Sequence, residues 1–450
     1  MNYIKFINHA SIIISNGKIG LLSDPWYSGS VFHEGWSLIH ENEKNEILDI
    51  LNEINYIWIS HEHPDHFSVP FFVDSEIKNK INELKIKILF QKTIDRRVYQ
   101  FFLKNKYEVI ELNENQNFHL DTDFNIELFK SHFYDSGLIL KIGKDRILNL
   151  NDCPLNTEKE LNYFLKIYGE FDILLTQFSY AAWKGGEKNK NWRKDAADEK
   201  IDAVIKQCEI LKIKKLIPFA SYIYFSNVMN SYLNDSINTP KKISNALSNK
   251  NVDVITFKPL EKQYISDLKQ DLKSEEFWSK KYSEIDSLPL NKYKDSFSLN
   301  ELQESLVNYR KKIISNNSKL LILLISKIKI LGIFAQIRIF LIDHNKVIKY
   351  SIFKDLEYMI NQKEYDIKLY SSSLKFIFDN EFGFDTLTVN GCFESEGKSF
   401  SKVAKNFSIG SLNTLGIKFN IFLVFNLRII MLFLKQSSRV GKKLKNQFAL

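Results

Sequence analysis

The chain has 450 residues, of which 44% are hydrophobic and 26% are charged, and its formal net charge is +8 at pH 7. This composition is that of a globular protein and excludes intrinsically disordered, low-complexity and collagen-like classes. The length favours two or three domains, each with its own core. Eight of the nine histidines lie within the first 132 residues, which indicates that the chemistry is concentrated there.

The excess positive charge is concentrated near the end of the chain. Five basic residues and no acidic residue follow position 434: Lys435, Arg439, Lys442, Lys443 and Lys445. We therefore predict no nucleic-acid surface, whereas this basic tail is a candidate for peripheral contact with an anionic membrane face. The alternative is a buried helix with a solvated tail. The apolar stretches 320–342 and 419–434 both contain basic residues, so neither predicts a membrane span.

The cysteines and the first residues of the chain indicate the cellular compartment in which the protein works. The three cysteines are too few and too scattered for a disulfide framework. Met1 is followed by a sequence without the long apolar run of a signal peptide. We therefore expect a cytoplasmic protein, with the basic tail as its one candidate contact with the inner face of a membrane.

Short β-rich runs separated by turn residues predict strands through the first 260 residues. In chain order they are 3–8, 11–15, 19–23, 55–60, 87–90, 108–112, 124–130, 137–142, 146–150, 172–178 and 215–219. Apolar residues at helical spacing between 201 and 211 predict a helix before the last of these strands. Strands interleaved with helices indicate the α/β class, with two sheets packed face to face.

Changes in composition divide the chain into three parts. Residues 1–262 are predicted to form the catalytic domain. Acidic residues and lysines dominate 263–318, which predicts a charged helical linker. Residues 319–450 are predicted to form a C-terminal α+β domain, and the sequence indicates no chemistry for it, since His344 is its only histidine.

A dense group of metal-binding residue types follows the apolar strand 55–60. The sequence there is His61-Glu62-His63-Pro64-Asp65-His66. Imidazole and carboxylate groups are common ligands of zinc, iron and manganese. In an extended loop residues two apart point the same way, so we predict that His61 and His63 share one metal ion. Asp65 and His66 are then placed to face a second ion.

This motif resembles the signature of the metallo-β-lactamase superfamily, and the resemblance covers roughly the first 260 residues. It implies an αββα sandwich, in which two packed mixed sheets are flanked by helices. It also implies His132 as the third ligand of the first metal ion and Asp152 as a bridge between both ions. Asp24, in a Leu-Ser-Asp-Pro context, corresponds to the residue that supports the metal-binding loop. His9 is near these elements in sequence and is a candidate for a similar supporting role or for substrate contact.

One ligand that the resemblance implies is missing. Most members of the superfamily supply a histidine to the second metal ion from the last strand of the domain. Here that strand is followed by Ala220-Ser221-Tyr222, and no histidine lies between 133 and 343. Either the site holds one ion, or water, substrate or an oxygen ligand such as Ser221 or Tyr222 completes it. We expect one or two Zn²⁺ ions per chain, with iron or manganese as alternatives.

Residues around the motif narrow the resemblance. Asp24–Gly29, Gly35-Trp36 and Pro218–Ala220 are similar to the β-lactamase-fold part of the CMP-N-acetylneuraminate hydroxylases. They are more distantly similar to the phospholipase D that acts on N-acyl-phosphatidylethanolamine and to the ascorbate-6-phosphate lactonases. The hydroxylases also carry a Rieske module, which needs Cys-x-His pairs. None of the three cysteines here has a histidine two residues away.

These features predict a metallo-hydrolase. Metal-bound hydroxide would attack a phosphodiester, ester, lactone or amide of a small anionic substrate, such as a sugar nucleotide, sugar phosphate or lipid phosphate, and Asp65 would accept a proton. Trp183, Lys184 and Tyr222 are predicted to contact substrate, with a solvated loop and core packing as the alternatives. Two other functions stay open, namely an iron oxygenase component with a separate electron donor and a non-catalytic binding protein. The sequence does not indicate the oligomeric state.

Overall fold

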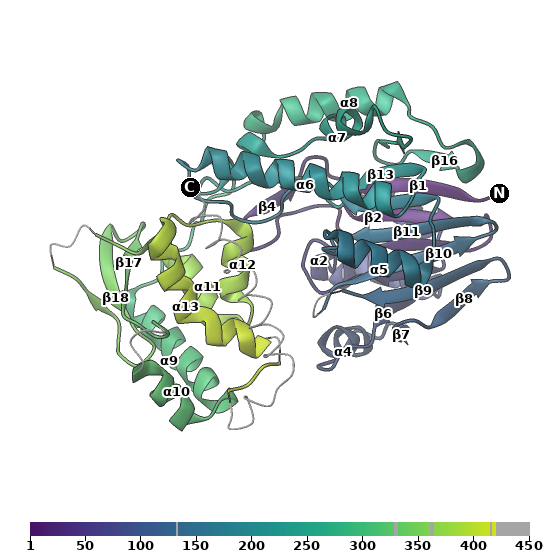
Figure 1. The fold of residues 1–450 in the computed structure, drawn as a ribbon. Coiled ribbons are helices and arrows are strands. Elements are labelled where there is room, and N and C mark those ends of the chain that lie inside the picture. Colours follow the sequence, from purple (N-terminus) through teal and green to yellow (C-terminus); the bar gives the residue numbers. More distant parts are fainter. Residues whose placement is uncertain (132–133, 328–331, 361–363, 415, 420–450) are drawn as a thin grey trace. The chain divides into compact units, whose positions relative to one another are not determined.

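The structure is a computed structural model that describes residues 1–131, 134–327, 332–360, 364–414 and 416–419. The chain forms two compact units, Met1–Asn291 and Lys292–Leu450 (Figure 1). Two predictions lie outside the described residues, namely His132 as a metal ligand and the basic tail after 434 as a membrane contact.

The first unit contains two seven-stranded sheets, and the first of them has the order β16-β1-β2-β3-β5-β6-β7. Its strands are β1 (Tyr3–Asn8), β2 (Ser11–Ser15), β3 (Gly20–Ser23), β5 (Tyr56–Ile59), β6 (Lys87–Gln91), β7 (Val109–Leu112) and β16 (Lys262–Tyr264). β1, β2 and β3 are antiparallel neighbours, whereas β3, β5, β6 and β7 are parallel. β1, β3 and β5 therefore run in the same direction, and the residues that follow them meet at one edge of the sheet.

The second sheet has the order β15-β13-β12-β11-β10-β9-β8. Its strands are β8 (Asn117–Asp121), β9 (Phe124–Lys130), β10 (Ser136–Ile142), β11 (Asp145–Asn151), β12 (Ile173–Gln177), β13 (Lys215–Phe219) and β15 (Asp253–Val254). β11, β12, β13 and β15 are parallel, and the other pairs are antiparallel. A short pair, β4 (Trp36–Leu38) with β14 (Ile223–Phe225), lies apart from both sheets.

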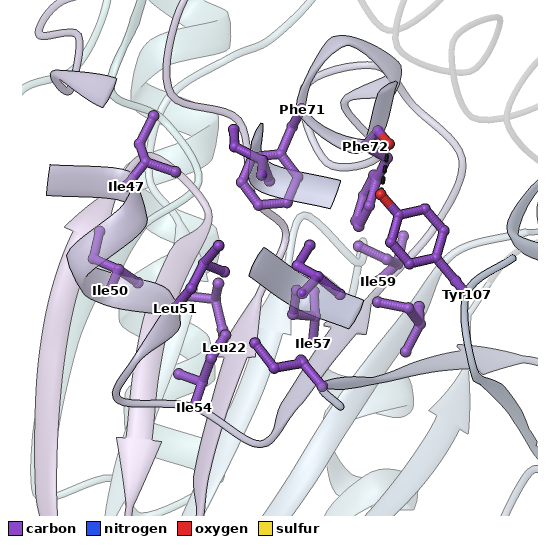
Figure 2. Close-up of a cluster of buried hydrophobic side chains, with 14 of the residues drawn as sticks. Leu22, Ile47, Ile50, Leu51, Ile54, Ile57, Ile59, Phe71, Phe72 and Tyr107 are labelled. Carbon is purple, nitrogen blue, oxygen red and sulfur yellow. Dashed lines mark hydrogen bonds between the residues drawn. The ribbon is translucent and has the colours of Figure 1, made fainter. Parts of the chain in front are cut away.

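Four helices pack on one face of the first sheet: α1 (Lys44–Leu51), α2 (Val69–Val73), α3 (Ser75–Glu83) and α4 (Arg97–Lys104). Figure 2 shows the hydrophobic cluster between these helices and the strands. Ile57 and Ile59 of β5 point into this cluster, so Trp58 between them points to the opposite face, where it is also fully buried. Because β5 is buried on both faces, the loop that follows it starts from a rigid position.

Helices also pack against the second sheet. The helices that complete the unit are α5 (Glu158–Tyr168), α6 (Lys190–Ile210), α7 (Pro240–Leu247) and α8 (Leu272–Ser283). Phe164 of α5 packs on Phe129 of β9, with ring centroids 4.9 Å apart. Phe6 of β1 contacts Phe219 of β13 across the two sheets. The predicted α/β class, with two large mixed sheets flanked by helices, is confirmed.

Residues 263–291 belong to the first unit rather than to a linker. Tyr264 of β16 pairs with Tyr3 of β1, and Trp278 of α8 is 1% exposed. Trp278 Nε1 donates to the carbonyl of Phe257 at 2.6 Å, and its ring lies 4.2 Å from that of Tyr222. The boundary predicted at 262 therefore differs from the structure, because a few buried aromatic residues anchor a segment whose composition is dominated by charges.

Replacing Trp278 with alanine is expected to destabilise the first unit by about 3–5 kcal/mol, because it removes a large buried ring and leaves a cavity. Urea unfolding followed by circular dichroism measures this change. Leu272→Ala on the same helix is the control, because Leu272 is 71% exposed. Equal stability of the two variants would contradict the assignment of α8 to this unit.

The second unit is built from a four-stranded sheet of order β19-β18-β17-β20 and several helices. Its elements are α9 (Leu299–Asn316), α10 (Lys319–Lys327), β17 (Ile337–Leu341), β18 (Lys346–Tyr350), β19 (Glu357–Tyr358), β20 (Ile367–Leu369), α11 (Ser371–Asp379), α12 (Gly383–Asn390) and α13 (Gly397–Thr414). Tyr350 stacks on Phe378 and Phe407 in its core. Within the described ranges, no helix has the length and apolarity needed to cross a membrane.

Candidate metal centre

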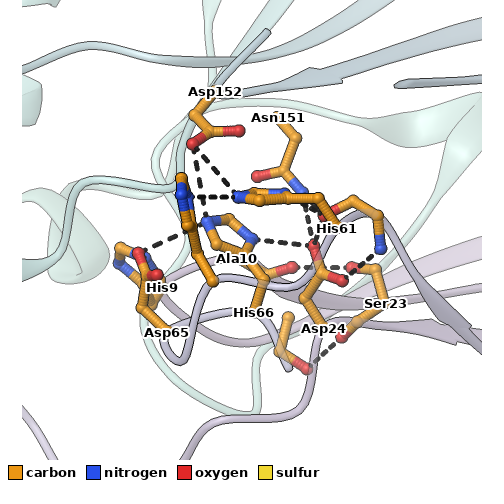
Figure 3. Close-up of polar contacts among 12 residues, drawn as sticks. His9, Ala10, Ser23, Asp24, His61, Asp65, His66, Asn151 and Asp152 are labelled. Carbon is orange, nitrogen blue, oxygen red and sulfur yellow. Dashed lines mark hydrogen bonds and ion pairs between the residues drawn. The ribbon is translucent and has the colours of Figure 1, made fainter. Parts of the chain in front are cut away.

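The predicted metal-binding residues that the structure describes meet where strands of both sheets end (Figure 3). Asp24 follows β3, and His61 comes two residues after the end of β5. Asp152 directly follows β11 of the second sheet, and His9 lies in the turn between β1 and β2. The parallel course of these strands brings the four positions together, although they are up to 143 residues apart.

A first group of donor atoms comes from His61, His63 and Asp152. The Nε2 atom of His61 lies 2.8 Å from Nδ1 of His63 and 3.6 Å from Oδ2 of Asp152. His61 is buried, whereas His63 is exposed at the rim of the site. The other ring nitrogen of His61 lies 3.0 Å from the hydroxyl of Ser60, which fixes the orientation of the ring.

A second group comes from His9, Asp65 and His66, and all three are buried. Oδ2 of Asp65 lies 3.3 Å from Nε2 of His66 and 3.5 Å from Nε2 of His9. Oδ2 of Asp152 also lies 3.8 Å from Nε2 of His66, so a single carboxylate oxygen stands between the two groups. This is the position that a carboxylate bridging two metal ions would occupy.

The side chain of Asp24 connects several residues of the site through hydrogen bonds. Its side chain is buried and accepts hydrogen bonds from the backbone N–H of Ser60 at 2.8 Å and the hydroxyl of Ser60 at 2.7 Å. It also pairs with Nδ1 of His66 at 2.9 Å and accepts from the amide of Asn151. A proton held on Nδ1 of His66 leaves Nε2 as the metal-binding atom, which is how carboxylates commonly orient metal-bound histidines.

The electrostatics of the group suit metal binding. Burial lowers the pKa of His61 and of His9, which keeps both rings neutral near pH 7. Burial also disfavours the cation of His66, but the carboxylates of Asp65 and Asp152 outweigh this and raise the pKa of His66 well above its usual value. Although burial opposes it, His66 holds the pKa of Asp65 well below the usual range. His9 and His61 are therefore neutral beside ionised carboxylates, as metal ligands must be, whereas His66 holds a second proton that an ion binding at its Nε2 would displace.

Several buried donor atoms of the site lack a hydrogen-bond partner, which is expected of atoms that bind an ion. In the described part of the chain, both ring nitrogens of His9 and the Oδ1 atoms of Asp65 and Asp152 are buried without a hydrogen bond. Such atoms are rare in native structures, because burial without a partner is costly. A mixed set of imidazole nitrogens and carboxylate oxygens fits zinc, iron or manganese.

Among the described residues, the structure shows no direct side-chain contact that joins Trp183 and Lys184 to Tyr222, the three residues predicted to contact substrate. The ring of Trp183 is mostly buried and packs on Trp192, and Lys184 is partly buried. Tyr222 lies in the core, and its hydroxyl donates to the carbonyl of Pro218 at 3.0 Å. These contacts make core packing, the alternative for Tyr222, the better description of that ring.

Two residues near the metal-binding groups have no distinguishing signal in the sequence. Lys200 of α6 interacts electrostatically with Asp152 and with Lys184, and its burial lowers its pKa to about 8. Burial, followed by the negative charge of Asp152, raises the pKa of Asp135 to about 7. Lys200 lies within an ordinary charged helix and Asp135 directly precedes β10, so only the fold reveals their position.

No protein-family model matches the chain. The sequence is similar to the cytidine monophosphate-N-acetylneuraminic acid hydroxylase of Danio rerio, with 24% identity over 277 residues, covering 57% of this chain and 44% of the relative. The chain spans about half the length of the curated relatives it matches.

Two similar solved structures are the metallo hydrolase Igni18 from Ignicoccus hospitalis and the metallo-β-lactamase-fold protein YhfI from Bacillus subtilis. Igni18 has 13% identity and a TM-score of 0.40, covering 58% of this chain and 97% of its own. YhfI has 12% identity and a TM-score of 0.39, covering 58% and 98%. The resemblance that the motif indicates is confirmed by the two mixed sheets and by the paired donor groups at the strand ends.

Proposed function

We propose that this chain is a metal-dependent hydrolase of the metallo-β-lactamase superfamily. The observation that carries the proposal is the pair of adjoining donor groups, with Oδ2 of Asp152 lying between His61 and His66. Two clusters of imidazole and carboxylate groups that share one oxygen, with four of their members buried, are hard to explain by packing alone, because ionisable groups are costly to bury. They are the expected architecture of a site for two divalent cations.

The residues of the chain have separate roles in this proposal. A divalent ion in the site would lower the pKa of a bound water towards 7 and polarise the bond to be cleaved. Asp65 offers Oδ1, which has no hydrogen-bond partner in the described part of the chain, as the acceptor for the proton of the attacking water. Asp24 and Ser60 hold His66 and His61 in fixed orientations.

The surroundings of the site favour an anionic substrate. Lys200 places a positive charge near Asp152, and Lys184 lies near Lys200 in turn. Their partial burial strengthens attraction to an incoming anion, because charges interact more strongly away from bulk water. A phosphodiester or a carboxylate-bearing ester or lactone is therefore the substrate class that we propose.

The proposal is tested on the purified full chain by elemental analysis together with a hydrolysis panel of phosphodiesters, esters and lactones. We expect one or two equivalents of zinc, iron or manganese and metal-dependent hydrolysis of an anionic member of the panel. A chelator should remove the activity, and added metal should restore it. Bound metal with no hydrolysis across the panel would contradict the proposal and favour a binding protein.

Replacing Lys200 with glutamine is expected to lower kcat/KM for an anionic substrate by about tenfold or more, which is the effect of losing one hydrogen bond to a charged group. The change for a neutral ester should be much smaller. Lys206→Gln on the exposed side of the same helix is the matched control. A loss of equal size for neutral and anionic substrates would contradict a role of Lys200 in substrate recognition.

A second candidate function comes from the sequence match. The curated relatives at 24% identity are hydroxylases, so an iron oxygenase component is the alternative. The donor groups are compatible with iron as well as zinc. Iron in the purified protein, with a spectrum that changes on reduction, and no hydrolysis would favour this alternative. This alternative also requires an electron donor.

A further inference from the structure

The second donor group needs a further ligand, and the end of β13 does not provide one. The strand ends at Phe219 and continues into Ala220 and Ser221. The hydroxyl of Ser221 accepts from the backbone N–H groups of Phe178 and Ser179, so it is engaged in holding a neighbouring loop. The hydroxyl of Tyr222 is likewise engaged with a backbone carbonyl. Neither of the oxygen ligands considered from the sequence is therefore available.

A histidine from the other sheet is held at this place instead. The carbonyl of His9 accepts a hydrogen bond of 2.9 Å from the backbone N–H of Ala220, the residue directly after β13. His9 has a positive φ of 36°, a turn conformation that is uncommon for residues other than glycine. Its own N–H donates to the side chain of Asn8, which in turn donates to the carbonyl of His40 and to Asn42. The turn is thus fixed against the end of β13.

The ring of His9 is directed at the donor atoms of the second group. Its Nε2 lies 3.5 Å from Oδ2 of Asp65, which is too long for a good hydrogen bond but fits two ligands of one ion. The donor atoms of His9, Asp65 and His66 all lie within 4.8 Å of one another. His9 is 2% exposed, and neither of its ring nitrogens has a hydrogen-bond partner in the described ranges. The rings of His9 and Trp26 are in T-shaped contact, with their centroids 5.5 Å apart.

We infer that His9 is a ligand of the second metal ion, together with Asp65, His66 and the shared carboxylate of Asp152. It takes the place of the histidine that the resemblance leads one to expect after β13. A ligand from the β1–β2 turn, rather than a supporting residue, accounts for the unpartnered Nε2 of His9 and for the attachment of this turn to Ala220. This inference deepens the proposed function, because it rests on the same pair of donor groups.

The test is metal stoichiometry rather than activity. The full chain, stripped with a chelator, is titrated with Co²⁺, and each equivalent is followed by visible absorption and by elemental analysis after dialysis. We expect two equivalents for the unchanged protein and one for His9→Ala, with binding of the second ion weakened by about 100-fold or more. The retained first equivalent shows that the variant is folded. His40→Ala is the control, because the side chain of His40 lies outside both donor groups.

A second variant separates loss of a ligand from loss of structure. His9→Gly suits the positive φ at this position and opens a space in which free imidazole can bind. Imidazole is expected to restore the second Co²⁺ equivalent in His9→Gly but not in Asp65→Ala. Two equivalents in His9→Ala, or only one in the unchanged protein, would overturn the inference while leaving a metal centre in place. No metal in the unchanged protein would overturn both the inference and the proposed function.

Discussion

Replacement of His61 by alanine is expected to remove at least one metal equivalent per chain and to lower kcat/KM for hydrolysis by at least about 100-fold. His61 is the centre of the first donor group, since its Nε2 lies close to both His63 and Asp152. Its loss also removes the contact with the hydroxyl of Ser60. Elemental analysis and steady-state kinetics on the same preparation measure the two effects together.

A control histidine makes this result specific. His119 is exposed on β8 and is in neither donor group, so His119→Ala should keep both the metal content and the activity. The same measurement applies to His132→Ala, which tests the third ligand that the resemblance implies. A His61→Ala protein with unchanged metal content and unchanged activity would rule out the proposed centre.

Replacement of Asp24 by asparagine is expected to have the second large effect, and to act on stability and metal binding together. Asp24 binds no ion in the proposed centre, but its buried carboxylate accepts from Ser60 and Asn151 and pairs with His66. The side chain of asparagine has one acceptor oxygen where aspartate has two, so at least one of the buried donors around residue 24 loses its partner. We expect a loss of about 3–5 kcal/mol in the free energy of unfolding and metal binding that is about 10–100-fold weaker.

Asparagine is the informative replacement, because it tolerates the positive φ of 36° at this position as readily as aspartate. The variant therefore changes the charge and leaves the backbone unstrained. Asp49→Asn on the exposed side of α1 is the control and should change stability by less than about 0.5 kcal/mol. Unfolding in urea with and without Zn²⁺ separates the two effects. An Asp24→Asn protein as stable and as tight in metal binding as the original would contradict the supporting role.

Much of the first unit could be predicted from the sequence, because its signals are local. The apolar run of β5 leads directly into the histidine motif, so the strand and four of the ligands come from one short segment. Asp24 and Asp152 also stand directly after strands, at the ends where the resemblance places them. His132 stays a prediction, since it is outside the described residues.

The role of His9 could not be predicted from local signals. It depends on β1, β2 and β3 forming an antiparallel meander, which turns the β1–β2 connection towards the end of β5. The position of Lys200 near Asp152 depends in the same way on how α6 lies along the second sheet. The assignment of residues 263–291 to the first unit depends on Trp278, a single buried ring in a segment whose average composition is that of a linker.

Because the candidate centre joins residues from both sheets, bound ions would also connect the two sheets mechanically. His61 and Asp24 belong to the first sheet and Asp152 and Asn151 to the second, so ions held between them would fasten the two layers to each other. A ligand at 100 times its Kd adds about 2.7 kcal/mol to the stability of the folded state. The supply of metal in the cell would then help to set how much of this protein is folded and escapes degradation, independently of how fast it turns over substrate.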